Sequence, residues 1–143
     1  MSVMLLRKVI SLASRVPASA PQNAISFSVA NFAKRTGIVH VQNYKEFKEI
    51  CIDNEAPVIA DFFASWCKPC AELSRRFDFL MEKYEDKVCL AKVDIDKVDE
   101  IISEYEILAT PTVIAIKNGK EVSRFTGLKE SEVIEKFIKE HTN

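Results

Sequence analysis

The sequence predicts one α/β domain in which helices cover a central β-sheet, and three observations lead to this fold class. Between residues 38 and 105, short β-rich runs alternate with segments of helical periodicity in the order βαβαβα. Residues 58–64 are almost continuously apolar, which is typical of a strand buried on both faces. A hairpin signal and a last amphipathic helix follow, and 143 residues with 48% hydrophobic composition give room for one core of fair size.

The first part of the predicted domain contains two strands joined by a helix. Residues 38–42 alternate like a short strand. Asn43, with Glu46 three residues later, predicts the N-cap of a helix that runs to about Asn54. A proline ends this pattern, and residues 58–64 then form the buried strand.

The second predicted helix begins at a pair of cysteines, Cys67 and Cys70. Its apolar residues repeat at helical spacing, and they are Leu73, Phe77, Leu80, Met81 and Tyr84. Residues 88–93 form another buried strand, and residues 98–105 form a third helix.

The C-terminal part changes from alternating elements to a hairpin and a helix. Residues 112–117 and 121–126 are β-rich and flank Asn118-Gly119, a strong signal for a tight hairpin turn. The last helix is expected to direct four apolar residues inward, namely Val133, Ile134, Phe137 and Ile138.

The first 35 residues differ in composition from the rest of the chain. They contain six serines and no acidic residue, and their basic residues are Arg7, Lys8, Arg15, Lys34 and Arg35. These properties are typical of an organelle transit peptide. We expect residues 1–35 to direct the protein to the mitochondrial matrix and to be cleaved, which leaves residues 36–143 as the folded domain.

Three alternatives for this leader stay open, namely a secretory signal, a plastid transit peptide and a merely disordered tail. Ala18-Ser19-Ala20 resembles a signal cleavage site. The apolar run at residues 9–13 contains a serine and is well short of the apolar region of a secretory signal.

Charge and hydropathy argue against two classes of partner. Residues 36–143 carry 15 basic and 21 acidic side chains, whereas nucleic acid binding requires clustered Lys and Arg to neutralise phosphates. No stretch approaches the roughly 18 consecutive apolar residues of a membrane span. We therefore expect a domain that binds neither nucleic acid nor membrane.

The Cys67-x-x-Cys70 spacing allows an intramolecular disulfide across one turn. The start of a helix lowers the pKa of the first thiol because unpaired N–H groups and the positive end of the helix dipole stabilise its thiolate. Pro69 fits the first helical turn, where its missing N–H is not needed. Lys68 adds a positive charge beside Cys67, which would tune the potential by roughly 20 mV.

A structural zinc site is the competing use of this spacing. Zinc would need two further ligands. The other cysteines and the two histidines lie in separate predicted elements without ligand pairing, and they are Cys51, Cys89, His40 and His141. Cys51 and Cys89 fall on apolar faces and are expected to be core residues, so no metal is expected.

Asp61 interrupts the buried strand between Ile59 and Phe63. A desolvated carboxylate has a raised pKa and can accept a proton near neutral pH. Lys92, midway along the neighbouring predicted strand, is a candidate electrostatic partner. The alternative is a strand carboxylate that simply reaches solvent.

Several motifs together resemble the thioredoxin family. In order and spacing they are Asp61-Phe62-Phe63-Ala64-Ser65-Trp66-Cys67-Lys68-Pro69-Cys70, Lys92-Val93-Asp94-Ile95-Asp96, Thr110-Pro111-Thr112 and Lys117-Asn118-Gly119. The resemblance covers roughly residues 38–142, and residues 104–107 are similar to mitochondrial members. It implies a thioredoxin fold, a central mixed β-sheet flanked by helices on both faces, and this agrees with the element order above.

The resemblance also implies roles for residues. Cys67 would be the attacking thiolate and Cys70 the resolving thiol, with Asp61 assisting proton transfer at Cys70. Lys92 is a further catalytic candidate, not from the resemblance but from its predicted place on the strand beside Asp61. Pro111 would be a cis-proline that faces the cysteine pair. The residues that would bind the substrate are Trp66, Lys68, Pro69, Thr110, Pro111 and Gly127.

Three residues depart from the family pattern. Lys68 stands where the family usually has glycine, which bears on redox potential and partner choice. Phe63 replaces a common tryptophan, and Arg75 occupies a position where many members have a helix-kinking proline. These two changes concern local packing.

The leading hypothesis is a monomeric protein-disulfide reductase that supports redox homeostasis by dithiol–disulfide exchange. The resemblance implies no bound cofactor besides the redox-active disulfide, with electrons coming from NADPH through a thioredoxin reductase. It implies disulfide-containing partners such as peroxiredoxins. The alternatives are an oxidase or isomerase of the same fold, and a binding or chaperone module that works without turnover.

Overall fold

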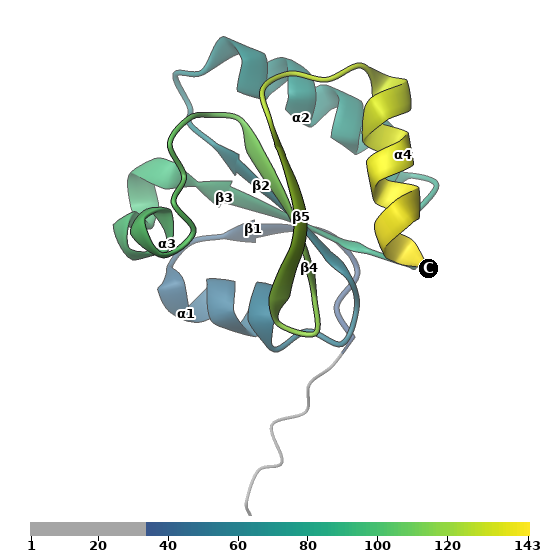
Figure 1. Cartoon of the computed structure of the whole chain (residues 1–143), viewed down its shortest axis with the longest axis horizontal. Coiled ribbons are helices and arrows are strands. Elements are labelled where there is room, and N and C mark those ends of the chain that lie inside the picture. The colour runs from purple at the N-terminus through teal and green to yellow at the C-terminus, as the bar shows by residue number, and fades with distance from the viewer. Residues whose placement is uncertain (1–33) are drawn as a thin grey trace, which may run out of the picture.

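A computed structural model describes residues 34–143 of the chain. They form a five-stranded sheet with helices on both faces (Figure 1). The strands are β1 (Gly37–Val41), β2 (Val58–Phe63), β3 (Cys89–Asp94), β4 (Thr112–Lys117) and β5 (Lys120–Thr126). Apart from Lys34 and Arg35, the predicted leader lies outside the described residues.

The sheet is mixed, with the strand order β1-β3-β2-β4-β5. β3 pairs in parallel with β1 and β2, whereas β4 pairs antiparallel with β2 and β5. This arrangement confirms the fold class expected from the sequence. Because the carboxyl ends of parallel strands meet at one edge, β2 and β3 end on the same side, and antiparallel β4 begins there, with Thr112 opposite Phe62.

The predicted helices are present, with differences at their ends. They are α1 (Tyr44–Phe47), the π-helical segment η1 (Lys48–Ile52), α2 (Lys68–Met81), the 3₁₀ turn η2 (Ile95–Lys97), α3 (Asp99–Glu104) and α4 (Ser131–Thr142). Asn43 caps α1 as expected, since its side chain accepts the N–H of Glu46 at 2.9 Å. The Glu46 carboxylate in turn accepts the N–H of Gln42.

The sheet separates two apolar clusters. On one face, α1, η1 and α3 pack against the sheet around Phe47, Phe62 and Ile101. On the other face, α2 and α4 pack around Phe77 and Ile134 (Figure 1). Since β2 lies inside the sheet and is covered on both faces, all of its residues except Phe63 are buried.

The inward position of Val133 expected from the sequence is wrong, because its side chain is 49% exposed. The buried residues of α4 are Ile134, Phe137 and Ile138. They follow the i, i+3, i+4 spacing of one helix face, and Val133 lies about 100° away from Ile134 around the axis. The buried face of α4 is therefore narrower than the pattern of apolar residues in the sequence indicated.

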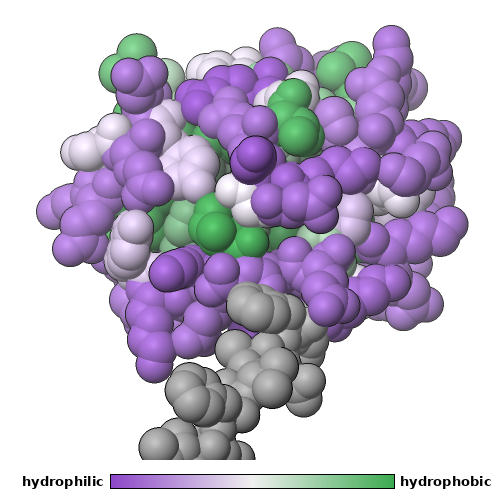
Figure 2. Space-filling model, turned by 60° about the horizontal axis from the view of Figure 1, so that its bottom comes forward, coloured by the Kyte–Doolittle hydropathy of each residue, from purple (hydrophilic) through white to green (hydrophobic). Residues whose placement is uncertain are grey.

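Hydrophilic side chains cover most of the face shown in Figure 2, and apolar side chains form small patches on it. Within residues 34–143, no helix has both the length and the apolar character needed to cross a membrane.

Candidate active site

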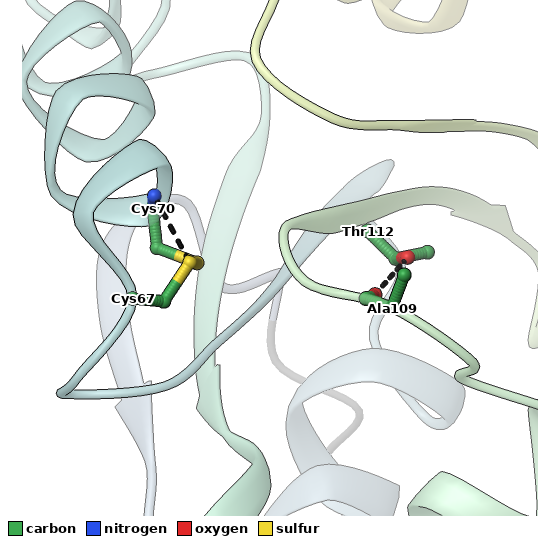
Figure 3. The surroundings of a disulfide bond; sticks show 4 residues. All are labelled: Cys67, Cys70, Ala109 and Thr112. Atoms are coloured by element: carbon green, nitrogen blue, oxygen red, sulfur yellow. Dashed lines mark hydrogen bonds between the residues drawn. A yellow bond between two sulfur atoms is a disulfide. The ribbon is translucent and has the colours of Figure 1, made fainter.

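Cys67 and Cys70 form a disulfide at the N-terminus of α2 (Figure 3). Cys67 is the N-cap residue with an extended backbone, and its sulfur accepts the N–H of Cys70 at 3.3 Å. Pro69 lies in the first helical turn, where it leaves no N–H unsatisfied. In the reduced state, the same N–H group and the helix dipole would stabilise a thiolate on Cys67.

The surroundings of the two cysteines differ. Cys67 is 7% exposed and Cys70 is 2% exposed. Trp66 precedes the pair and is 69% exposed, and Lys68 and Pro69 between the cysteines are also exposed. An exposed aromatic and a cation therefore flank Cys67, whereas Cys70 is almost fully desolvated.

Asp61 is a fully buried carboxyl on β2. Among residues 34–143, neither of its carboxylate oxygens has a hydrogen-bond partner. Burial raises the pKa of Asp61 to about 7, although the positive charge of Lys92 acts in the opposite direction and the negative charge of Asp78 adds to the rise. The burial and raised pKa expected from the sequence are both present, so this carboxyl can exchange a proton near neutral pH.

Lys92 pairs in register with Asp61 across β2 and β3. Its ammonium group, however, donates to the Ser74 hydroxyl at 2.7 Å and to the Asp78 carboxylate at 2.5 Å. The direct partners of Lys92 are therefore on α2. Asp61 is affected only through the longer-range attraction between the two charges.

The loop before β4 lies opposite the disulfide (Figure 3). Its Thr110-Pro111 peptide bond is cis. The Pro111 carbonyl accepts the N–H of Gly127 at 2.8 Å, and the Thr112 hydroxyl donates to the Ala109 carbonyl at 2.6 Å. These bonds hold the loop to Gly127, the residue after β5, and to itself. Gly127 comes next to Pro111 because β4 and β5 pair with Thr112 opposite Thr126.

Two cavities border the cysteine loop. One, of about 130 Å³, is lined by Trp66, Ile95, Ile107, Leu108, Ala109 and Thr110. The other, of about 180 Å³, is lined by Phe63, Ala64, Ser65, Cys67, Cys70, Ala71 and Ser74. The first lies between Trp66 and the loop before β4, which contributes Leu108, Ala109 and Thr110.

Two residues that line the first cavity, Leu108 and Ile95, were not predicted from the sequence as site residues. Leu108 is 94% exposed. The sequence does contain a signal for it, since Leu108 is an apolar residue in a short loop beside Ala109-Thr110. Ile95 packs against the cluster of Ala64, Cys67 and Cys70.

The remaining cysteines lie away from the disulfide. Cys51 and Cys89 are buried in the apolar cluster beneath α1 and α3, as expected. Burial raises the pKa of Cys51 well above its usual range and that of Cys89 to about 11. Within the described part of the chain, no three His, Cys, Asp or Glu side chains gather closely enough to hold a metal ion.

Comparisons with known proteins give one consistent family. The Thioredoxin family model matches residues 38–140. Mitochondrial thioredoxin of Rattus norvegicus is 40% identical over 83% of this chain and 70% of its own length, and that of Mus musculus is 43% identical over 70% and 60%. The chain thus spans 60–70% of the length of these two relatives.

Solved structures agree with the sequence relatives. The thioredoxin of Malassezia sympodialis has a TM-score of 0.69 and 28% identity, with 78% of this chain and 96% of that chain covered. A mutant thioredoxin from Halobacterium salinarum has a TM-score of 0.68 and 29% identity over the same shares. With its mixed sheet, its disulfide at the start of α2 and the family match over residues 38–140, the chain belongs to the thioredoxin family.

Proposed function

We propose that this chain is a protein-disulfide reductase that works by dithiol–disulfide exchange through Cys67 and Cys70. Members of the thioredoxin family are disulfide oxidoreductases, and this chain has the cysteine pair that their chemistry requires. The observation that carries the proposal is the position of Cys67 as the N-cap of α2, where the helix start stabilises a thiolate.

The exchange proceeds in two steps. The Cys67 thiolate attacks one sulfur of a target disulfide, so the target S–S bond breaks, a mixed disulfide forms and the other target sulfur leaves as a thiolate. The Cys70 thiol then loses its proton and attacks the Cys67 sulfur. The Cys67–Cys70 bond forms, the target leaves with both of its sulfurs reduced, and two electrons have passed to it.

Asp61 is the proposed acceptor of the Cys70 proton. A base with a pKa near the working pH is the most effective at such a transfer, and the Asp61 carboxyl has a pKa of about 7. Asp61 and Phe63 are two residues apart on β2, and Phe63 packs against the cluster of Ala64, Cys67 and Cys70. This position near the cysteines supports the proposed role of Asp61.

The substrate would bind along the surface beside the disulfide. Trp66, Lys68 and Pro69 would contact it from the cysteine loop, and Thr110 would offer its backbone to an extended segment, as in strand addition. Pro111 and Gly127, which are linked by a backbone hydrogen bond, would complete this surface.

The oxidised pair is proposed to be reduced by a thioredoxin reductase that draws electrons from NADPH. Disulfide-containing proteins such as peroxiredoxins would be its targets, and the chain would act as a monomer in the mitochondrial matrix. The basic, acid-free leader at residues 1–35 and relatives named mitochondrial thioredoxins support this location. Residues 36–143 would be the mature domain after cleavage.

The test is the reduction of a model protein disulfide by the processed chain, with Cys51→Ser as the matched control for Cys67→Ser. Because Cys51 is buried away from the pair, we expect full activity in the control and none in Cys67→Ser. A normal rate in Cys67→Ser would refute the proposal. Loss of activity in Cys67→Ser while partner binding and the cellular phenotype persist would favour a binding module.

The redox potential of the pair separates a reductase from an oxidase or isomerase. Thioredoxin potentials are about −270 mV and isomerase potentials about −180 mV. We expect a value close to the first, displaced slightly by Lys68. A value near the second would assign the chain to the other class.

A further inference from the structure

Lys92 is a buried cation in the middle of the sheet. Its side chain is 9% exposed, and β3 lies between β1 and β2. An ammonium group removed from water costs several kcal/mol unless it is paired and hydrogen-bonded. The side chain reaches across to α2, where Ser74 and Asp78 both bind its nitrogen. These two residues are four apart and therefore share one helix face.

Two carboxylates compete for this single cation. Asp61 stands opposite Lys92 in the β2–β3 register but receives no hydrogen bond. Asp78 receives the hydrogen bond, and its side chain is 50% exposed. A half-exposed carboxylate keeps part of its hydration when charged, whereas ionised Asp61 would lose all of it, so the pair with Asp78 is the less costly one.

Few other titratable groups face this site. On β4, Asp61 is opposite the apolar Val113, and on β1 the register partner of Lys92 is the exposed His40. α4 covers the same face of the sheet, but its acidic residue Glu135 pairs with Lys83 and Lys139, and Glu130 just before α4 pairs with Arg76. On α2, Cys67 and Cys70 form the disulfide.

We propose that Asp78 and Ser74 are positioning residues that hold the Lys92 ammonium on the α2 side of the sheet and thereby set how readily Asp61 takes up a proton. Held in this way, Lys92 neutralises Asp78 and attracts the Asp61 charge only from a distance. Released, it would be free to pair directly with Asp61 and would keep this carboxyl ionised. The link to catalysis rests on the proposed function, in which Asp61 accepts the proton of Cys70.

Asp78→Asn tests the anchor directly. It removes a negative charge from the vicinity of Asp61 and also frees Lys92, and both effects favour ionised Asp61. An opposite charge brought within a few ångströms lowers a carboxyl pKa by about one to three units, so we expect the Asp61 midpoint to fall by at least about one unit. Ser74→Ala removes one hydrogen bond without changing charge and should lower it by less.

The measurement is a carbon NMR titration of the Asp61 carboxyl in the oxidised protein. The variants are wild type, Asp78→Asn, Lys92→Met, the double variant and Glu82→Gln, which removes an exposed negative charge just after α2. We expect Lys92→Met to raise the midpoint. Asp78→Asn should lower the Asp61 midpoint by less in the Lys92→Met background than in wild type. In that background no lysine can be released to pair with Asp61, and only the loss of the Asp78 charge remains.

Two results would overturn the proposal. An equal shift from Asp78→Asn in both backgrounds would mean that Asp78 acts through its own charge alone. A shift of the Asp61 midpoint from Glu82→Gln as large as that from Asp78→Asn would mean that any negative charge in or near α2 suffices. The titration needs no substrate, so it decides the positioning role even if the protein fails to reduce disulfides and the proposed function is wrong.

If the proposed function holds, the pH profile of the resolving step gives a second readout. The midpoint of mixed-disulfide release should fall in Asp78→Asn by the same amount as the Asp61 titration, and it should stay unchanged in Glu82→Gln. An Asp61 midpoint that moves while the release profile does not would refute the link between Asp78 and catalysis.

Discussion

Replacing Asp61 with asparagine should stabilise the oxidised protein at alkaline pH and give little gain at acid pH. The carboxyl is fully buried and its oxygens have no hydrogen-bond partner among the described residues. Its ionised form is therefore costly in the folded state but not in the unfolded chain. Asparagine has nearly the same shape and cannot ionise, so it removes only the pH-dependent part of this cost.

The magnitude follows from the two pKa values. Folding raises the pKa of Asp61 from 3.8 to about 7. A rise of about three units, at about 1.4 kcal/mol per unit, corresponds to roughly 4 kcal/mol. Between these pH values the folded protein binds a proton that the unfolded chain has released, so stability falls as pH rises. The cost is absent below pH 3.8 and fully developed above pH 7.

Denaturant unfolding of the oxidised protein at several pH values between about 4 and 9 would measure this. The control is Asp86→Asn, since Asp86 is exposed in the turn after α2. The side-chain amide that Asp61→Asn introduces also lacks partners and costs about 1–3 kcal/mol, but equally at every pH. The test is therefore the change with pH of the stability difference between variant and wild type. A difference that stays constant with pH would refute the reasoning.

Three further predictions concern stability and thiol chemistry. Gly119 and Gly127 both have positive φ, but a Cβ on Gly119 would also lie 3.0 Å from a backbone oxygen of η1. Unfolding curves should therefore show a larger loss for Gly119→Ala than for Gly127→Ala, which should cost about 1 kcal/mol. Phe77→Ala should cost about 3–5 kcal/mol in the same assay, because Phe77 is fully buried between α2 and the sheet. Cys51 and Cys89 should react with a thiol reagent at neutral pH only after unfolding, because both are buried with raised pKa values.

The sequence predicted the elements better than their arrangement. Hydrophobic periodicity follows each residue's immediate surroundings, so the buried strand at residues 58–64 and the amphipathic α2 could be recognised locally. The order of strands depends on contacts between segments far apart in the chain. Neither the pairing of β1 with β3 nor the antiparallel β4 beside β2 leaves a local pattern, and only the family resemblance supplied this topology.

The candidate site shows the same division. Asp61 could be identified because a carboxylate breaks an otherwise apolar run, and its burial followed from the strand around it. The partner of Lys92 could not be identified, because a long side chain on β3 can reach the next strand or the helix above. Asp78 belongs by its pattern to the solvent face of α2 and is half exposed, yet its carboxylate binds a buried cation.

The proposed exchange requires opposite acid–base properties of two cysteines three residues apart, and their positions in the fold favour this difference. Cys67 must be a thiolate when a target arrives, and the N-cap position and Cys70 N–H favour that form. Cys70 must keep its proton until the mixed disulfide has formed, and burial in the first turn favours the neutral thiol. A neutral Cys70 then needs a base that is itself unprotonated at working pH. The Asp61 carboxyl is the proposed base, because a pKa of about 7 leaves part of it ionised near neutral pH, and in our proposal the Lys92–Asp78 pair helps to set that balance.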